Sequence, residues 1–224
     1  MRAVVFDFDG VIVDSEPAHF RALAECLEPE GITINEREYE RQYLAYDDRE
    51  AIRIALETHE VTHDRETIEH IAVRKAQIFE KLILEIGLLP GVRALVESLQ
   101  REVPIAIASG ALRTEIEQIL DATELRGAIS LIVAADDVSR TKPDPEPFLR
   151  AITALAAQTP DLRPEECLAF EDSIAGIASA RAAGMKVIGI TNSYPAGRLG
   201  AAHHVLDTLV GLDCAGARRL FEEN

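Results

Sequence analysis

Residues 6–16 have the sequence Phe6-Asp7-Phe8-Asp9-Gly10-Val11-Ile12-Val13-Asp14-Ser15-Glu16. They continue from the apolar run Ala3–Phe6, which lacks polar alternation and is typical of a strand buried on both faces. Asp7 and Asp9 therefore stand at the carboxyl end of a strand, which is where open α/β sheets bind their ligands. Gly10 allows the chain to turn sharply away from that edge.

Two carboxylates at this position have a specific chemical use. A carboxylate can attack phosphorus and form an aspartyl phosphate. A second acid nearby can protonate the leaving oxygen and later deprotonate water. Because neighbouring carboxylates repel each other, such a pair calls for a divalent cation. We favour this interpretation, with Asp7 as nucleophile and Asp9 as proton-transfer partner. The alternative is that both residues only end a strand and cap the next helix.

Further apolar runs indicate four more buried strands, and segments with helical periodicity separate them. Pro90 is expected at the first position of one helix, whose apolar face is Val92, Leu95, Val96 and Leu99. Strands that alternate with helices predict an α/β fold with a doubly wound parallel sheet, a Rossmann-like core. The expected strands are Ile105–Ala108, Leu131–Ala134, Leu168–Phe170 and Val187–Ile190, and the other expected helices are 111–120, 146–157 and 173–183.

The interval 16–85 breaks this alternation, because it contains no convincing strand. Its pattern predicts amphipathic helices at 17–27, 36–43, 48–57 and 65–84. We therefore expect a catalytic α/β core domain formed by 1–15 and 86–224, and an inserted α-helical cap domain formed by 16–85.

Composition excludes several classes of protein. The formal net charge of −16 repels nucleic acid and anionic lipid, so neither is an expected partner. No apolar run is long enough to span a bilayer, and the first residues do not resemble a secretory signal. The three cysteines are far apart and have apolar neighbours, which indicates buried thiols in a reducing compartment. These features predict a cytoplasmic protein. Its oligomeric state is not visible in the sequence.

Polar residues also follow three other predicted strands. Ser109-Gly110 precedes a helix, so its hydroxyl and N–H could bind phosphate, although Ser-Gly is also an ordinary turn. Lys142, one of only four lysines, lies in a proline-rich loop and is either a site residue or a solvated loop lysine. Glu171-Asp172 could complete a Mg²⁺ site of oxygen ligands, or Asp172 could cap the next helix.

Together these elements resemble the four motifs of the haloacid dehalogenase superfamily, which are Asp-x-Asp-Gly, Ser, Lys and Glu-Asp in that order. The helical insert is similar to the smaller cap type of that family. The resemblance implies that Asp7 is the nucleophile and a Mg²⁺ ligand, and that Asp9 is the acid-base, with its backbone carbonyl on Mg²⁺. It implies that Ser109 and Gly110 bind the phosphoryl group and that Lys142 offsets charge between this group and Asp7. Asp172 would be the third metal carboxylate, with Glu171 close behind.

Two activities within the family remain open. Asp9 argues against dehalogenation, because the dehalogenases lack an acid at this position. The first activity is a Mg²⁺-dependent phosphatase acting on a small phosphorylated metabolite, either a phosphosugar or a phosphoglycolate-like monoester. The second is a phosphosugar mutase similar to β-phosphoglucomutase. Ala111-Leu112-Arg113 departs from the polar residues that this mutase carries after its phosphate-binding Ser, which favours the phosphatase.

Three residues of the insert fall where the mutase has similar substrate-binding residues. His19 would order the acid-base Asp, Arg49 would grip a distal phosphate, and Lys75 would reach the site from the cap. Each also has a structural interpretation. His19 could be a helix-surface histidine near the domain junction, Arg49 could pair with Asp48 or the neighbours of Arg53 on an exposed face, and Lys75 could be solvated.

Two other hypotheses have less support. His59-Glu60-Val61-Thr62-His63 matches a zinc protease pattern, but it is polar and looks like the end of one helix and the turn to the next. A non-catalytic binding protein on the same fold should have lost at least one of four residues, and this chain retains all of them: Asp7, Asp9, Lys142 and Asp172.

Overall fold

The computed structural model describes residues 1–44 and 46–223. They form two compact units. The core unit consists of Met1–Asp14 with Gly87–Asn224, and the helical unit is Ser15–Ile86. None of the helices in the described part of the chain is long and apolar enough to cross a membrane.

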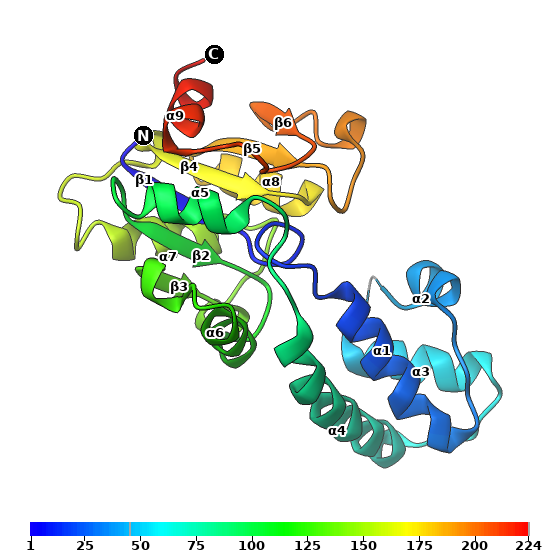
Figure 1. The fold of residues 1–224 in the computed structure, drawn as a ribbon. Coiled ribbons are helices and arrows are strands. Elements are labelled where there is room, and N and C mark those ends of the chain that lie inside the picture. The colour runs from blue at the N-terminus through cyan, green and yellow to red at the C-terminus, as the bar shows by residue number, and fades with distance from the viewer. Residues whose placement is uncertain (45, 224) are drawn as a thin grey trace. The chain divides into compact units, whose positions relative to one another are not determined.

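The core unit is built on a six-stranded sheet in which every neighbouring pair of strands is parallel. The strand order is β3-β2-β1-β4-β5-β6, so the chain starts in the middle and winds outward in both directions (Figure 1). This confirms the predicted α/β class. The strands are β1 (Ala3–Phe6), β2 (Ile105–Ala108), β3 (Leu131–Val133), β4 (Cys167–Glu171), β5 (Lys186–Ile190) and β6 (His204–Leu206).

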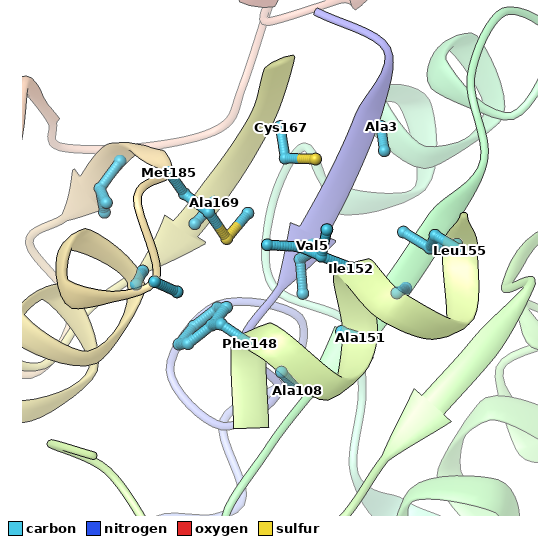
Figure 2. Packing of buried hydrophobic residues seen from close by; sticks show 14 of the residues in the cluster. Ala3, Val5, Ala108, Phe148, Ala151, Ile152, Leu155, Cys167, Ala169 and Met185 are labelled. Atoms are coloured by element: carbon cyan, nitrogen blue, oxygen red, sulfur yellow. The ribbon is translucent and has the colours of Figure 1, made fainter. Parts of the chain in front are cut away.

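Helices cover both faces of this sheet. Ala3 and Val5 belong to one buried cluster with residues of α7 (Glu146–Leu155) and α8 (Ile174–Ala182), and Figure 2 shows Val5 beside Ile152 and Phe148. Successive side chains of a strand point to opposite faces. Val4 and Phe6 therefore face the other side, where they are also fully buried. The remaining helices of the core unit are α5 (Val92–Leu99), α6 (Arg113–Ala122) and α9 (Cys214–Glu222).

The start of α5 corrects one prediction. Pro90 does not occupy the first helical position, because α5 begins at Val92 and Gly91 is its N-cap with φ +90°. A Cβ at Gly91 would lie 2.3 Å from the Leu209 carbonyl carbon, so the chain needs glycine at this close approach. The predicted apolar face of the helix is confirmed, since its four residues are all buried.

Two elements near the end of the chain were not predicted. β6 is an edge strand of three half-buried residues, too short to give a clear apolar run. α9 contains Gly216, which weakens a helical pattern, but Asp213 caps it by accepting the Gly216 N–H at 2.7 Å.

In the helical unit, the described residues form four α-helices around an apolar core of their own. Leu23 and Leu27 of one helix pack with Leu56 and Ile71 of two others. Two of the helices begin at carboxylate caps, since Asp47 and Asp64 accept backbone N–H groups of Glu50 and Thr67. The helices are α1 (Glu16–Leu27), α2 (Glu36–Gln42), α3 (Asp48–Thr58) and α4 (Arg65–Leu82).

All three cysteines are buried and free, as the sequence predicts. The segment His59–His63 lies between the end of α3 and the start of α4. His59 Nε2 lies 3.1 Å from Glu38 Oε1, and His63 Nδ1 lies 3.0 Å from the Val61 carbonyl oxygen. The two histidines are therefore not on one helix, which the zinc protease mechanism requires.

The packing of α7 gives a direct stability test. Leu155 is fully buried in the cluster of Figure 2, whereas Leu149 on the same helix is 41% exposed. We expect Leu155→Ala to lower the free energy of unfolding by about 2–5 kcal/mol, because it leaves a cavity. Leu149→Ala, the matched control, should cost less than about 1 kcal/mol. Urea unfolding curves measure both, and equal losses would contradict this account of the core.

Candidate active site

The candidate site lies at the carboxyl edge of the sheet, where three strands end side by side. Phe6 pairs with Ile107 of β2 and with Phe170 of β4, so the three strands end within one residue of each other. The residues that follow are Asp7 after β1, Ser109 after β2 and Asp172 after β4. Hydrogen bonds continue the strand pairing at this edge: the Asp7 N–H donates to the Phe170 carbonyl at 2.9 Å, and the Ser109 N–H donates to that of Val133.

Lys142 joins two of the predicted acids. Its Nζ lies 2.8 Å from Asp7 Oδ1 and 2.7 Å from Glu171 Oε1. Only 13% of the Lys142 side chain is exposed, and Nζ also lies 5.1 Å from the centroid of the Phe148 ring. The interpretation of Lys142 as a solvated loop lysine is therefore wrong.

Glu171 is held on both of its oxygens. Oε1 receives Lys142, and Oε2 accepts hydrogen bonds from the Ser173 N–H at 2.7 Å and the Ser173 hydroxyl at 2.9 Å. The carboxylate packs on the first turn of α8, where a Cβ at Gly176 would lie 1.5 Å from Oε1. Because both oxygens have partners, the geometry fits Glu171 as an anchor for Lys142.

Asp172 points into the site and does not cap α8. The cap is Ser173, whose hydroxyl accepts the Gly176 N–H at 2.9 Å. The alternative of Asp172 as an N-cap is therefore wrong. Its Oδ2 accepts a hydrogen bond from the Ser193 hydroxyl and lies against Gly10, where a Cβ would be only 1.8 Å away. Gly10 has φ +73°, so the turn after β1 needs glycine for both its conformation and this contact.

These acids carry more negative charge than Lys142 can balance. Asp7, Glu171 and Asp172 each offer an oxygen within 4.8 Å of the others, and all three residues are buried. Burial, together with the charge of Glu171, raises the pKa of Asp7 well above its ordinary value. Burial likewise raises the pKa of Asp172 to about 7, against the Ser193 hydrogen bond. Burial alone would raise the pKa of Glu171 as well. The charge of Lys142 and the hydrogen bonds from Ser173 outweigh burial and hold this pKa below its ordinary value. A buried set of carboxylate oxygens with this excess charge fits a hard divalent cation.

Ser109, Gly110 and Asp9 lie at the same edge. Ser109 is buried, and its hydroxyl accepts the Ala111 N–H at 3.0 Å in the turn before α6. Gly110 is exposed in that turn, with open space beside its Cα. Asp9 is half-buried in the turn after β1, which closes when the Gly10 N–H donates to the Val13 carbonyl at 2.7 Å. The functions of these three residues stay predictions.

The helical unit brings together two of its three predicted site residues. Lys75 is 2% exposed, and its Nζ lies 2.6 Å from Asp48 Oδ1 and 3.0 Å from His19 Nδ1. The His19 ring stacks on Phe79 at a centroid distance of 4.2 Å. Burial and the charge of Lys75 lower the pKa of His19 to about 4, so neutral His19 accepts from the ammonium group through Nδ1. The interpretation of Lys75 as a solvated lysine is wrong.

Arg49 does not join this cluster. Its Nε and Nη2 donate to the Glu69 carboxylate at 2.9 and 3.0 Å, and 64% of its side chain is exposed. Arg49 is therefore an exposed, ion-paired arginine, as its structural interpretation suggested, but its partner is Glu69 and not Asp48 or a neighbour of Arg53. The roles of Arg49, His19 and Lys75 toward a substrate stay predictions.

Sequence reasoning missed the contribution of the loop after β5. Ser193 binds Asp172, and Asn192 Nδ2 donates to the Gly10 carbonyl at 2.6 Å. The polar run Thr191-Asn192-Ser193 directly follows a predicted strand and therefore ends at the same sheet edge as Asp7. The position of this run after a predicted strand was therefore the sequence feature that could have indicated a contribution to the site. Asp48 gave no comparable indication, because its partner Lys75 lies on another helix and is set by tertiary packing.

Comparison with known proteins agrees with this geometry. Residues 1–184 match the model of the haloacid dehalogenase-like hydrolases. A phosphorylated carbohydrates phosphatase of Thermotoga maritima is 30% identical over 201 residues, which cover 88% of this chain and 89% of that protein. The β-phosphoglucomutase of Bacillus subtilis is 29% identical over 201 residues, with 87% and 85% covered.

A solved structure shows the same architecture. CbbY from Rhodobacter sphaeroides, crystallised in complex with phosphate, superimposes with a TM-score of 0.77 at 27% identity. The match covers 97% of this chain and 99% of that one. The chain belongs to the haloacid dehalogenase-like hydrolases, in the branch that contains β-phosphoglucomutase and CbbY.

Proposed function

We propose that this enzyme is a Mg²⁺-dependent phosphatase that hydrolyses a small phosphate monoester, of the phosphorylated-sugar class, through an aspartyl phosphate on Asp7. The observation that carries the proposal is the Lys142 bridge between Asp7 and Glu171, beside Asp172. The names of the relatives, which include a phosphorylated carbohydrates phosphatase, support the substrate class.

The first half-reaction begins at Asp7. One of its oxygens attacks phosphorus, the bond from phosphorus to the ester oxygen breaks, and Asp9 gives its proton to the leaving alcohol. Lys142 orients Asp7 and favours its ionised form, which partly opposes the burial and the Glu171 charge that raise the pKa of Asp7. The Ser109 hydroxyl and the Gly110 N–H bind the oxygens of the transferring group.

The second half-reaction restores the enzyme. Asp9, now a carboxylate, removes a proton from water as the water oxygen attacks phosphorus. The bond between Asp7 and phosphorus breaks, which releases inorganic phosphate and the free carboxylate of Asp7. Atoms and charges balance, since the ester and one water become an alcohol and phosphate.

The metal would be held by Asp7, Asp172 and the backbone carbonyl of Asp9, with Glu171 close behind. Bound Mg²⁺ supplies positive charge that offsets the developing charge on the phosphoryl oxygens. The donor set fits this ion, because it consists of carboxylate and carbonyl oxygens.

Asp7→Asn should abolish turnover, because an amide cannot serve as the nucleophile. We expect kcat for release of phosphate from a panel of sugar phosphates with MgCl₂ to fall on the order of 10³-fold or more. Asp121→Asn, an exposed acid on α6, is the matched control and should keep wild-type activity. Near-normal turnover by Asp7→Asn, in a protein with an unchanged circular dichroism spectrum, would sink the mechanism.

The excess charge of the site predicts how stability changes with pH. The pKa of Asp172 is raised from 3.8 to about 7 in the folded protein. Its contribution to stability is therefore complete below about pH 4 and is lost as the pH rises through about 7. We expect the Tm of the protein in EDTA to fall across this window, and MgCl₂ to raise it more at pH 8 than at pH 5.

Asp172→Asn is the control for this experiment, because the acidic surface gives a slope of the same sign in both proteins. The variant should show a flatter decrease of Tm between pH 4 and 8 and a smaller response to MgCl₂. Identical pH slopes for the two proteins would show that Asp172 does not carry the excess charge.

Product analysis separates the phosphatase from the mutase. We expect hexose 1-phosphates, incubated with enzyme, MgCl₂ and a hexose bisphosphate, to release one inorganic phosphate for each substrate consumed. Phosphorus NMR follows both products. Rapid formation of the hexose 6-phosphate without phosphate release would replace the proposal with a phosphosugar mutase.

A further inference from the structure

The loop that follows β5 makes two inward contacts at the candidate metal site. It leaves the carboxyl edge of the sheet where β5 ends and then returns to the start of the parallel strand β6 (Figure 1). The first residue of the loop is Thr191, which two hydrogen bonds hold in place. Its backbone N–H donates to the Leu206 carbonyl, and its hydroxyl donates to Asp207, both at 3.0 Å. The next two side chains reach the motifs after β4 and β1: Ser193 donates to Asp172 Oδ2, and Asn192 donates to the Gly10 carbonyl.

We propose that Ser193 and Asn192 are positioning residues of the metal site, which hold Asp172 and the turn after β1 in the arrangement that binds the cation. The inference rests on the metal site of the proposed function. It assigns a role to a loop that contains none of the four motifs.

Ser193 limits the rotation of the Asp172 carboxylate. The terminal torsion of an aspartate is broad, so an unsupported carboxylate samples many orientations. The Ser193 hydroxyl donates a hydrogen bond to Asp172 Oδ2, and the Cα of Gly10 packs against the same oxygen. The other oxygen, Oδ1, is then the one presented to a cation. Hydrogen bonds of this kind orient metal ligands in many proteins.

Asn192 acts on the backbone of the turn that carries Asp9. The peptide between Asp9 and Gly10 is oriented by the Gly10 N–H, which donates to Val13 at 2.7 Å. The following peptide is oriented by Asn192 through the Gly10 carbonyl, at 2.6 Å. Because both peptide planes are fixed, the Asp9 carbonyl keeps one direction. A turn that is already ordered loses less conformational entropy when a cation binds, so binding is stronger.

The test measures Mg²⁺ binding directly, by calorimetry on the wild-type protein and its variants without substrate. We expect Ser193→Ala to raise the Kd for Mg²⁺ by about 10–100-fold, the effect typical of losing such a partner. Ser193→Thr keeps the hydroxyl and should restore binding to near the wild-type value. Ser130→Ala is the matched control: Ser130 is exposed and precedes β3, at the opposite edge of the sheet, so its Kd should not change.

The expected result for Asn192→Ala is a rise in the Kd for Mg²⁺ in the same direction. An unchanged Kd in Ser193→Ala or in Asn192→Ala overturns the role of that residue, and absence of Mg²⁺ binding by the wild-type protein overturns both. A purely structural role would instead lower the Tm of the metal-free variant and leave the Kd of its folded fraction unchanged.

Because binding is measured without turnover, this outcome is separate from that of the phosphatase assays. If Ser193→Ala weakens Mg²⁺ binding but no phosphate ester is hydrolysed, the positioning role stands and the proposed function fails. If phosphate esters are hydrolysed but Ser193→Ala and the wild-type protein have equal Kd values for Mg²⁺, the proposed function stands and the positioning role fails.

Discussion

Lys142 holds the carboxylates of Asp7 and Glu171 at 2.8 and 2.7 Å, and the rest of the site depends on this bridge. Burial and the charge of Glu171 raise the pKa of Asp7 and so favour its neutral form, and Lys142 opposes this shift. One ammonium group next to two carboxylates favours their ionised forms and fixes their direction. Breaking such a buried pair leaves an uncompensated charge, so neither partner is free to change alone. The donors of Ser173 keep the far side of Glu171 in place.

The sheet makes this bridge possible. Because β1, β2 and β4 are parallel and end within one residue of each other, residues that are far apart in the sequence meet at one edge. Glycine appears at the two points where carboxylates press on backbone. A Cβ at Gly10 would overlap Asp172, and one at Gly176 would overlap Glu171. The conformation of the chain and the positions of the acids are therefore set together.

The core part of this arrangement could be predicted from the sequence. Each buried strand is an unbroken apolar run, and a polar residue immediately after such a run is at the carboxyl edge whatever the tertiary details. Asp7, Ser109 and Asp172 follow this rule. Lys142 needed the family resemblance, because it lies in a loop and no periodicity predicts the direction of a loop side chain.

Partners determined only by packing were not predictable in the same way. Lys75 lies in a helix with ordinary amphipathic spacing, and nothing in that pattern indicates that it is buried against Asp48 and His19. The exposed Arg49 has several acids within reach along the sequence, so its pairing with Glu69 depends on how α3 packs on α4. Ser193 depends on the path of the loop from β5 to β6, which the sequence leaves undefined.

The net charge of −16 constrains how such a site can bind a phosphate ester. Asp7, Glu171 and Asp172 with Lys142 sum to a charge of −2 when all are ionised, so this group of side chains repels a phosphate dianion. The N-terminus of α6 near Ser109 provides only a partial positive charge. A divalent cation held at this site would bring the sum to zero. In the proposed mechanism the cation therefore favours binding of the substrate, and the groups that we propose to orient Asp172 would affect substrate binding as well as metal binding.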